Sequence, residues 1–321
     1  MNGTVAPLRV LELFCGLGGM AAALGEAAEV VAAIDVDRRA LAVYAANHPG
    51  RTLARNLQAV HPADLEVFAA DLWTMSPPCQ PYTRRGHGRD VDDPRARSLL
   101  AVLTAFDTVR PRWLFLENVP GFAGSRAHRL LTTTLAAAGY RWRERLLCPS
   151  ELGMPNRRRR FYLVAARHDA ALGEPALPAE PPPHRPLEEH LEPRPPADLT
   201  VPAELVRRYR HALDVVDARR PQGVTACFTS AYGRSPVRSG SYLALEPLPA
   251  VGEGLPPLRR FSPSEILRLL GFPAGFRWPT DLPREVAWQL AGNSLALPAV
   301  RAMLAAVAPL AGRLAAGEAP P

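Results

Sequence analysis

The stretch Leu11–Met20, which reads LELFCGLGGM, decides the fold of this chain. Its apolar residues predict a short buried strand over Val10–Phe14, and the glycines predict a turn into a helix over Met20–Ala28. Glycines allow a backbone to come close to a ligand at the carboxyl end of a first strand. A ligand-binding turn is therefore expected here, although such a turn can also simply close a corner of a sheet.

The second strand supports a ligand at this turn. It is expected over Val30–Ile34 and leads into Asp35, about twenty residues after the turn, where a carboxylate can accept hydrogen bonds from ribose hydroxyls. The spacing GxGG, rather than GxGxxG, disfavours a pyrophosphate site. A dinucleotide-dependent oxidoreductase stays open at this point, because the turn alone would fit it nearly as well.

Strands and helices alternate through the first half of the chain. Further strands are expected over Leu72–Met75, Trp113–Glu117, Tyr140–Leu147 and Phe161–Ala166. Helices are expected over Arg38–His48, Ser98–Val109 and Ser125–Ala138, the second of them preceded by Asp93-Pro94 as a helix start. This alternation predicts an α/β fold with a doubly wound, mostly parallel sheet.

The alternation stops near Arg167. Proline is dense over Glu174–Pro202, which excludes a regular helix or a central strand and predicts an extended linker into a smaller, irregular region. The sequence Gly292-Asn293-Ser294 is then expected to open a closing helix, whose apolar residues from Val300 to Val307 have the spacing to pack back onto the sheet. We predict a catalytic domain over residues 1–173, a linker and small domain over 174–283, and a closing segment of the catalytic domain over 284–321.

The composition is that of an ordinary soluble globular protein, with 47% hydrophobic and 21% charged residues. The net charge of +7 favours polyanionic partners. However, the chain contains no lysine, and its richness in arginine, proline and glycine resembles the output of a GC-rich genome. The missing lysine excludes a Schiff-base enzyme.

The four cysteines lie far apart and form no CxxC pair. A zinc site and a secreted disulfide framework are therefore not indicated, no metal is expected, and a cytoplasmic location is favoured. We expect neither a signal peptide nor a segment that spans a membrane.

A candidate nucleophile, Cys79, lies in the segment SPPCQP immediately after the expected strand Leu72–Met75. Taken alone, it would more often be a buried structural cysteine. The strand Trp113–Glu117 delivers Glu117 to the same edge of the sheet, where a carboxyl group is costly unless it is paired or functional. Two chemically useful groups are thus expected to meet at one edge.

Basic residues precede the last expected strand of the sheet, in the run NRRRR. Period-two alternation places Arg158 and Arg160 on one face, whereas Arg157 and Arg159 are interpreted as solvated charges. An arginine near Cys79 would favour the thiolate, and its directed hydrogen bonds suit a base oxygen and a neighbouring phosphate.

Together these residues suit chemistry on a cytosine ring. Carbon 6 becomes attackable when an acid protonates or hydrogen-bonds N3 while a thiolate adds. Glu117 can be that acid if burial lets it carry a proton near neutral pH, and Cys79 can be the thiolate. The adduct can accept a methyl group at carbon 5 before Cys79 is eliminated.

With these residues in view, the chain resembles the cytosine-5 methyltransferase family. The cofactor turn, the PPCQ loop, Glu117-Asn118-Val119, the Arg-x-Arg pair and Gly292-Asn293-Ser294 occur in the family order. The resemblance implies a Rossmann-like domain that binds S-adenosyl-L-methionine (SAM), with a small target-recognition domain inserted before the last motif.

The resemblance is closer to the tRNA-directed type-2 branch of the family. The segment from Pro78 to Arg84, Cys227-Phe228-Thr229, Leu152–Asn156 and Arg260–Pro263 carry it. It implies methylation of the anticodon-loop cytosine at position 38 of aspartate tRNA. One departure is Cys15, which stands where the branch usually has serine.

The resemblance also implies the site residues. SAM contacts would fall on Phe14, Leu17, Gly18, Gly19, Asp35, Leu57, Gln58, Ser76, Asn293 and Ser294. Substrate contacts would fall on Arg84, Cys227, Phe228 and Thr229, although the last three can also be read as a plain strand in a small core.

Two other functions remain open. A DNA cytosine-5 methyltransferase would share every catalytic residue, and a nucleic-acid-binding protein that has lost turnover would keep only the surface. A tRNA target is favoured, because a loop cytosine costs less to extrude than a paired one. We expect the chain to act as a monomer.

Overall fold

The computed structural model describes residues 6–83, 89–221, 223–249 and 254–314. The chain divides into two compact units. Unit 1 comprises Met1–Leu147, Arg159–Leu177 and Ala299–Glu318, and unit 2 comprises Cys148–Arg158, Pro178–Pro298 and Ala319–Pro321. The domain boundaries inferred from the sequence, at residues 173/174 and 283/284, stay a prediction.

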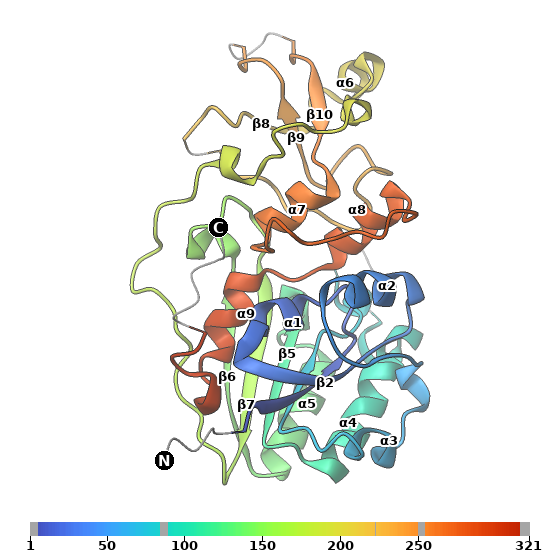
Figure 1. Cartoon of the computed structure of the whole chain (residues 1–321), viewed down its shortest axis with the longest axis vertical. Helices are drawn as coiled ribbons and strands as arrows, with labels where there is room; N and C mark the ends of the chain where they lie inside the picture. Colours follow the sequence, from blue (N-terminus) through green and yellow to red (C-terminus); the bar gives the residue numbers. More distant parts are fainter. Residues whose placement is uncertain (1–5, 84–88, 222, 250–253, 315–321) are drawn as a thin grey trace. The chain divides into compact units, whose positions relative to one another are not determined.

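The described part of unit 1 is built on a seven-stranded sheet with the order β3-β2-β1-β4-β5-β7-β6. Its strands β2, β5, β6 and β7 are labelled in Figure 1. The strands are β1 (Leu8–Leu13), β2 (Ala28–Asp35), β3 (Thr52–Ala54), β4 (Leu72–Met75), β5 (Trp113–Asn118), β6 (Tyr140–Leu147) and β7 (Arg160–Arg167). Strand β7 runs antiparallel to both of its neighbours, whereas the other pairs are parallel. The predicted mostly parallel α/β sheet is confirmed, and the order reverses between β1 and β4, where such sheets bind ligands.

Helices connect the strands of unit 1. They are α1 (Gly19–Leu24), α2 (Arg38–Asn47), α3 (Pro62–Glu66), α4 (Arg97–Val109) and α5 (Arg126–Ala137), and most of α9 (Leu297–Leu304) also belongs here. Capping side chains set two of the starts, since Asp37 accepts from the Arg39 N–H and Ser125 from the His128 N–H. Asp93 caps a 3-10 turn over Pro94–Ala96, and α4 follows it directly.

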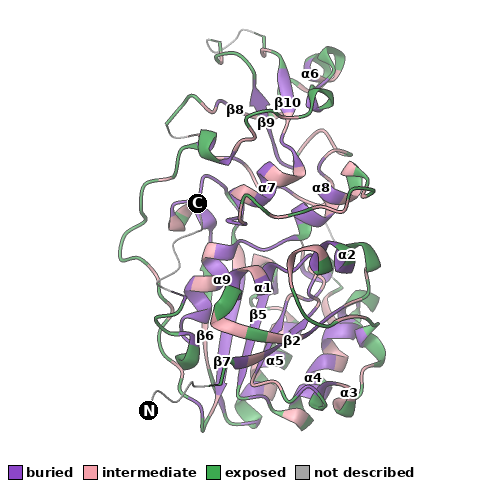
Figure 2. Ribbon diagram, in the orientation of Figure 1, coloured by how far each residue is buried: buried purple, intermediate pink, exposed green. Residues whose placement is uncertain are grey.

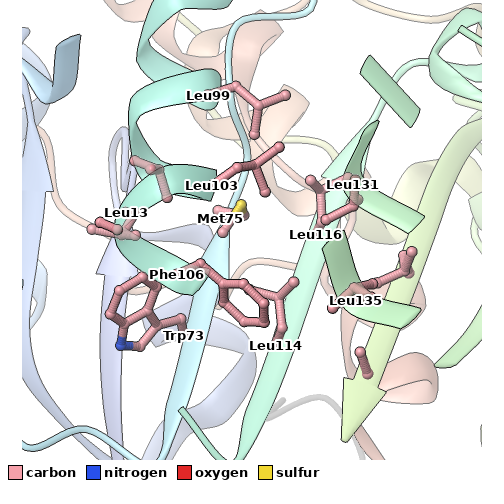
Figure 3. Packing of buried hydrophobic residues seen from close by; sticks show 14 of the residues in the cluster. Leu13, Trp73, Met75, Leu99, Leu103, Phe106, Leu114, Leu116, Leu131 and Leu135 are labelled. Atoms are coloured by element: carbon pink, nitrogen blue, oxygen red, sulfur yellow. The ribbon is translucent and has the colours of Figure 1, made fainter. Parts of the chain in front are cut away.

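The main core lies between the sheet and helices α4 and α5 (Figure 3). Trp73 of β4 and Leu114 of β5 pack with Phe106 of α4, and Leu131 of α5 belongs to the same cluster. A smaller cluster on α1 and α2 includes Ala33 of β2. Figure 2 shows the central strands buried, with exposed residues on the outer helices. Burial on both faces explains why these strands read as continuous apolar runs.

Unit 2 contains a three-stranded sheet with the order β10-β9-β8 in the described residues. Its elements are β8 (Asp214–Val216), β9 (Ser241–Ala244), β10 (Leu258–Arg260), α6 (Ala203–Tyr209), α7 (Pro263–Leu269) and α8 (Arg284–Asn293). Between Pro178 and Pro202 the chain forms only two short 3-10 turns, Leu187–His190 and Ala197–Leu199. The proline-rich segment thus contains no regular helix or central strand, as predicted, and its role as a linker stays a prediction.

The prediction that Gly292-Asn293-Ser294 opens the closing helix is wrong. Gly292 and Asn293 are the last residues of α8, and Ser294 is extended and caps its carboxyl end. The N–H of Ser294 donates to the Ala291 carbonyl and closes that helix. The closing helix α9 begins only at Leu297, with Pro298 in its first turn, where proline is tolerated.

In the described ranges, every helix is too short or too polar to cross a membrane.

Candidate active site

Asp35, at the end of β2, accepts backbone hydrogen bonds from the glycine turn after β1 and from the residues that follow β2. The Gly16 N–H donates to Asp35 Oδ2 at 2.8 Å, and the Asp37 N–H donates to Asp35 Oδ1 at 2.9 Å. Phe14 and Gly16 both have positive φ, so the chain bends sharply here. The carboxylate predicted to receive a ribose therefore also fixes the turn.

Gly18 allows a close approach between the turn and His48, which follows α2. Its φ is +96°, and a Cβ there would lie 2.4 Å from the His48 ring. The imidazole also meets the Tyr44 ring edge-on at 4.9 Å. Burial lowers the pKa of His48 to about 4, so the ring is neutral at physiological pH. Only glycine fits this position without strain.

Glu12, the second-last residue of β1, is a buried carboxyl that the sequence analysis missed. It accepts hydrogen bonds from the Met20 N–H at 3.3 Å and from the Tyr44 hydroxyl at 3.1 Å. Burial raises its pKa to about 8, against the lowering effect of these bonds. Glu12 thus ties the start of α1 to α2 beneath the turn. A charged residue inside an apolar strand was the signal for it.

The remaining predicted cofactor residues of unit 1 also lie at the carboxyl ends of strands. Gly19 begins α1, Leu57 is buried in a 3-10 turn after β3, and Gln58 beside it is exposed. Leu17 is buried in the turn, and Ser76 is half-buried directly after β4. The predicted cofactor residues of unit 1 thus lie at the carboxyl ends of four adjacent strands, β3, β2, β1 and β4.

Cys79 lies on a loop that begins where β4 ends. Met75 of β4 and Leu116 of β5 are register partners, so the loop starts beside the end of β5. The Asn118 side-chain amide donates to the Pro77 carbonyl at 3.0 Å, and the Tyr82 N–H donates to the Cys79 carbonyl at 2.9 Å. These bonds fix the loop on both sides of the half-buried Cys79.

Arg95 places a positive charge near Cys79, close enough for the two groups to interact electrostatically. Its guanidinium binds the buried Asp93 carboxylate at 2.8 and 2.6 Å and donates to Gln80 Oε1 at 3.0 Å. Hydrogen bonds from Arg95 hold the pKa of Asp93 well below its usual range. The sequence analysis missed Arg95 as a functional residue, although Asp93-Pro94 marked the segment.

Glu117 and Arg160 form an ion pair at the same edge. Glu117 Oε1 lies 3.5 Å from Arg160 Nε, and their side chains are 9% and 16% exposed. The Glu117 carboxyl is therefore a buried acid whose charge is balanced by a neighbouring guanidinium. The antiparallel course of β7 brings its first residue, Arg160, beside the end of β5.

The other predicted residues belong to unit 2. Arg158 is buried, and its guanidinium donates to main-chain carbonyls of that unit. Phe228 is buried in a cluster with Tyr232 and Phe261, at centroid distances of 5.0 and 5.3 Å. Cys227 and Thr229 flank it and are half-buried, and residues 226–229 are not part of a strand.

Asn293 is exposed and Ser294 is buried at the end of α8. The predicted substrate residue Arg84 lies outside the described residues. Among the described residues, no group of three or more histidine, cysteine, aspartate or glutamate side chains is arranged to hold a metal ion.

Known proteins match this chain over most of its length. A family model described as C-5 cytosine-specific DNA methylase matches residues 8–212. The Mus musculus tRNA (cytosine(38)-C(5))-methyltransferase is 31% identical, covering 93% of this chain and 92% of its own. A Dictyostelium discoideum DNA (cytosine-5)-methyltransferase is 28% identical over 92% of this chain and 93% of its own.

A crystal structure of a mutant of Spodoptera frugiperda DNMT2 has a similar fold, with a TM-score of 0.79 and 31% identity. The match covers 91% of this chain and 97% of that one. These matches point to the same family as the sheet order, the glycine turn and the cysteine loop. The chain therefore belongs to the C-5 cytosine methyltransferase family, whose members use SAM as the methyl donor.

Proposed function

We propose that this methyltransferase acts on tRNA, at the anticodon-loop cytosine at position 38 of aspartate tRNA, through a covalent adduct of Cys79. The observation that carries the proposal is that the Cys79 loop and the Glu117–Arg160 pair occupy the sheet edge next to the glycine turn. The tRNA target is supported by the mouse relative, which carries cytosine 38 in its name.

The residues of the turn fit SAM. A Cβ on Gly16 would meet nothing within 4 Å, so the backbone of the turn borders open space. Asp35 lies beside it, and the neighbouring Val36 is 70% exposed, which offers an apolar surface for a flat ring. We infer that the segment Phe14–Gly19 and Asp35 hold the cofactor, which supplies a methyl group on a sulfonium.

The side chains at this edge suit nucleophilic catalysis. The Cys79 thiolate, favoured by the Arg95 charge, adds to carbon 6 of the cytosine and forms a sulfur–carbon bond. Glu117 donates a hydrogen bond or a proton to N3, which stabilises the negative charge that builds up on N3 as the thiolate adds. Arg160, paired with Glu117, orients the base through O2.

The adduct makes carbon 5 nucleophilic, and carbon 5 receives the methyl group. A base then removes the carbon-5 proton, and the electron pair of that bond expels the Cys79 thiolate. The aromatic ring and the thiolate are restored, and N3 returns to Glu117 any proton that it received. The enzyme therefore turns over without an oxidant or a reductant.

Two substrates distinguish the target. The purified chain is incubated with labelled SAM and either an aspartate tRNA transcript or duplex DNA. We expect label in the tRNA, lost when cytosine 38 is replaced by uridine. Label in duplex DNA and none in tRNA would overturn the proposed target. The name of the Dictyostelium relative makes DNA methylation the second candidate.

The adduct has its own test, with tRNA that carries 5-fluorocytosine. Fluorine at carbon 5 cannot leave as a proton does, so the enzyme should remain bound to the RNA after methyl transfer. The wild type should form a complex stable in denaturing gels, whereas C79A should form none and still bind SAM. Methyl transfer by C79A would refute the adduct, whichever nucleic acid is the substrate.

A further inference from the structure

The guanidinium of Arg158 has acceptors for all of its terminal N–H groups inside unit 2. Nη1 donates to the Phe228 carbonyl at 2.9 Å and to Cys227 Sγ at 3.6 Å. Nη2 donates to the Gly292 carbonyl at 3.1 Å and to the Ser294 carbonyl at 2.5 Å. A guanidinium carries two hydrogens on each terminal nitrogen, so these four acceptors match the four terminal N–H groups of Arg158.

The four acceptors come from two segments that lie far apart in the sequence. Cys227–Thr229 was predicted to contact the substrate, and Gly292–Ser294 includes the predicted cofactor residues Asn293 and Ser294. The two segments also touch directly, because a Cβ on Gly292 would lie 2.3 Å from the carbonyl carbon and oxygen of Thr229. Arg158 therefore binds across a close backbone contact that only glycine permits.

The residues before Arg158 hold the same partner segment. The Asn156 side-chain amide donates to Thr225 Oγ1 at 2.9 Å and to the Ala226 carbonyl at 3.1 Å. The backbone of Arg157 donates to the Thr225 carbonyl, and that of Thr225 donates to Pro155. A parallel bridge joins Asn156 and Thr225. Arg158 is thus the last in a row of contacts that fix the 225–229 segment.

We propose that Arg158 is a positioning residue, which fixes Cys227–Thr229 against Gly292–Ser294 and does not itself contact the substrate. It is 3% exposed, and its terminal donors are directed at main-chain carbonyls and the Cys227 thiol. Arg160 differs, because its Nε faces the Glu117 carboxylate in unit 1. The inference rests on the proposed function for the roles of the two segments, but the contacts do not depend on the target.

Lysine cannot replace this arginine. A guanidinium is planar and donates from two separate nitrogens, whereas an ammonium is a single point charge. In R158K the charge remains, but the 227–229 and 292–294 carbonyls can no longer be bound together. R158Q loses the charge as well. We therefore expect both variants to loosen the two segments, with R158K the milder of the two.

Hydrogen exchange in the full-length protein, without SAM or nucleic acid, tests this role. Wild type, R158K and R158Q are compared by mass spectrometry of peptides that cover residues 226–232 and 290–296. We expect exchange in both peptides to accelerate about tenfold or more, with peptides of β4 and β5 unchanged. R159Q is the matched control, because Arg159 is an exposed neighbour, and its exchange should equal that of the wild type.

A direct role on the substrate gives the opposite pattern. Exchange in the free R158K protein would then equal that of the wild type while methyl transfer falls, and that result would overturn the proposal. If R158Q does not fold, R158K decides the question, with alkylation of the Cys227 thiol as a second measurement. Faster alkylation than in wild type supports the clamp, and an unchanged rate contradicts it.

Steady-state kinetics separate positioning from a general loss of stability. In R158K we expect the KM for the nucleic acid to rise about tenfold, with R158Q more affected, while hydrogen exchange in the β4 and β5 peptides of the same full-length protein stays at the wild-type rate. A wrong choice of tRNA over DNA would change the preferred substrate in all variants alike. It would leave the exchange difference between R158K and wild type intact, so the two failures are distinguishable.

Discussion

Replacing Gly18 by alanine tests whether SAM binding requires the shape of the glycine turn. Two costs follow from the structure. The φ of +96° lies in the left-handed region, which costs a residue with a Cβ about 1–2 kcal/mol. The new Cβ would also lie 2.4 Å from the His48 ring, and overpacking of this kind costs about 1–3 kcal/mol.

The sum is about 2–5 kcal/mol, provided that His48 cannot move away. The ring is held between Gly18 and Tyr44, which limits such a movement. If this whole cost is lost from the free energy of SAM binding, its lower bound of about 2 kcal/mol means that G18A should bind SAM at least about 30-fold more weakly than wild type. Isothermal titration of the full-length chain measures this directly.

Removing the His48 ring should relieve the clash with the new Cβ but not the backbone strain of the positive φ. G18A/H48A should therefore recover about 1–3 kcal/mol of the loss when it is compared through a double-mutant cycle with H48A. The control is G25A, since Gly25 also has positive φ but has open space around its missing Cβ. Its SAM affinity should match that of wild type. SAM binding by G18A within about threefold of wild type would refute the reasoning, because 1 kcal/mol already corresponds to about fivefold.

Three other substitutions probe the groups around the site. Burial raises the pKa of Glu12 to about 8, so the folded chain holds an extra proton and loses stability as the pH rises from about 4.5 to 8; E12Q lacks this titration, and its melting temperature relative to wild type should increase between pH 5 and pH 8. R95Q removes the charge near Cys79 and should slow methyl transfer at pH 7, with recovery at higher pH in a pH–rate profile. E117Q should lower kcat by about 100-fold or more, the usual contribution of a general acid, without changing SAM affinity by titration.

The strands of unit 1 were predictable because burial on both faces requires continuous apolar residues. Leu72–Met75 is the clearest case, since the predicted and observed bounds of β4 agree. Strand β3, with only Thr52–Ala54, was missed because it is short and partly exposed, so its sequence carries no strong pattern. Strands β8 and β10 have three residues each and are likewise too short to carry a recognisable pattern. Where tertiary pairing rather than burial defines a strand, the local sequence does not report it.

Glu12 and Arg95 show which site roles the sequence does not reveal, although Glu12 stands out as a charge inside an apolar strand. The role of Glu12 depends on Tyr44, which lies 32 residues away in the sequence. That of Arg95 depends on Gln80, 15 residues away. Both residue types are common in proteins, and neither spacing forms a motif. Their contribution exists only once the sheet has brought α2 to β1 and the cysteine loop to the start of α4.

The reversal of β7 explains why two arginines of one short motif have different partners. Arg160 is the first residue of β7, and it meets Glu117 near the end of β5 only because the two strands run in opposite directions. In a parallel β7 the first residue, Arg160, would lie beside the amino end of β5, away from Glu117. Two residues earlier, the chain still belongs to unit 2, and there Arg158 donates to carbonyls of that unit. Period-two alternation correctly separated both arginines from the exposed Arg157 and Arg159. It could not show that one of the two faces a carboxylate and the other a set of carbonyls, because this depends on which unit folds around each residue.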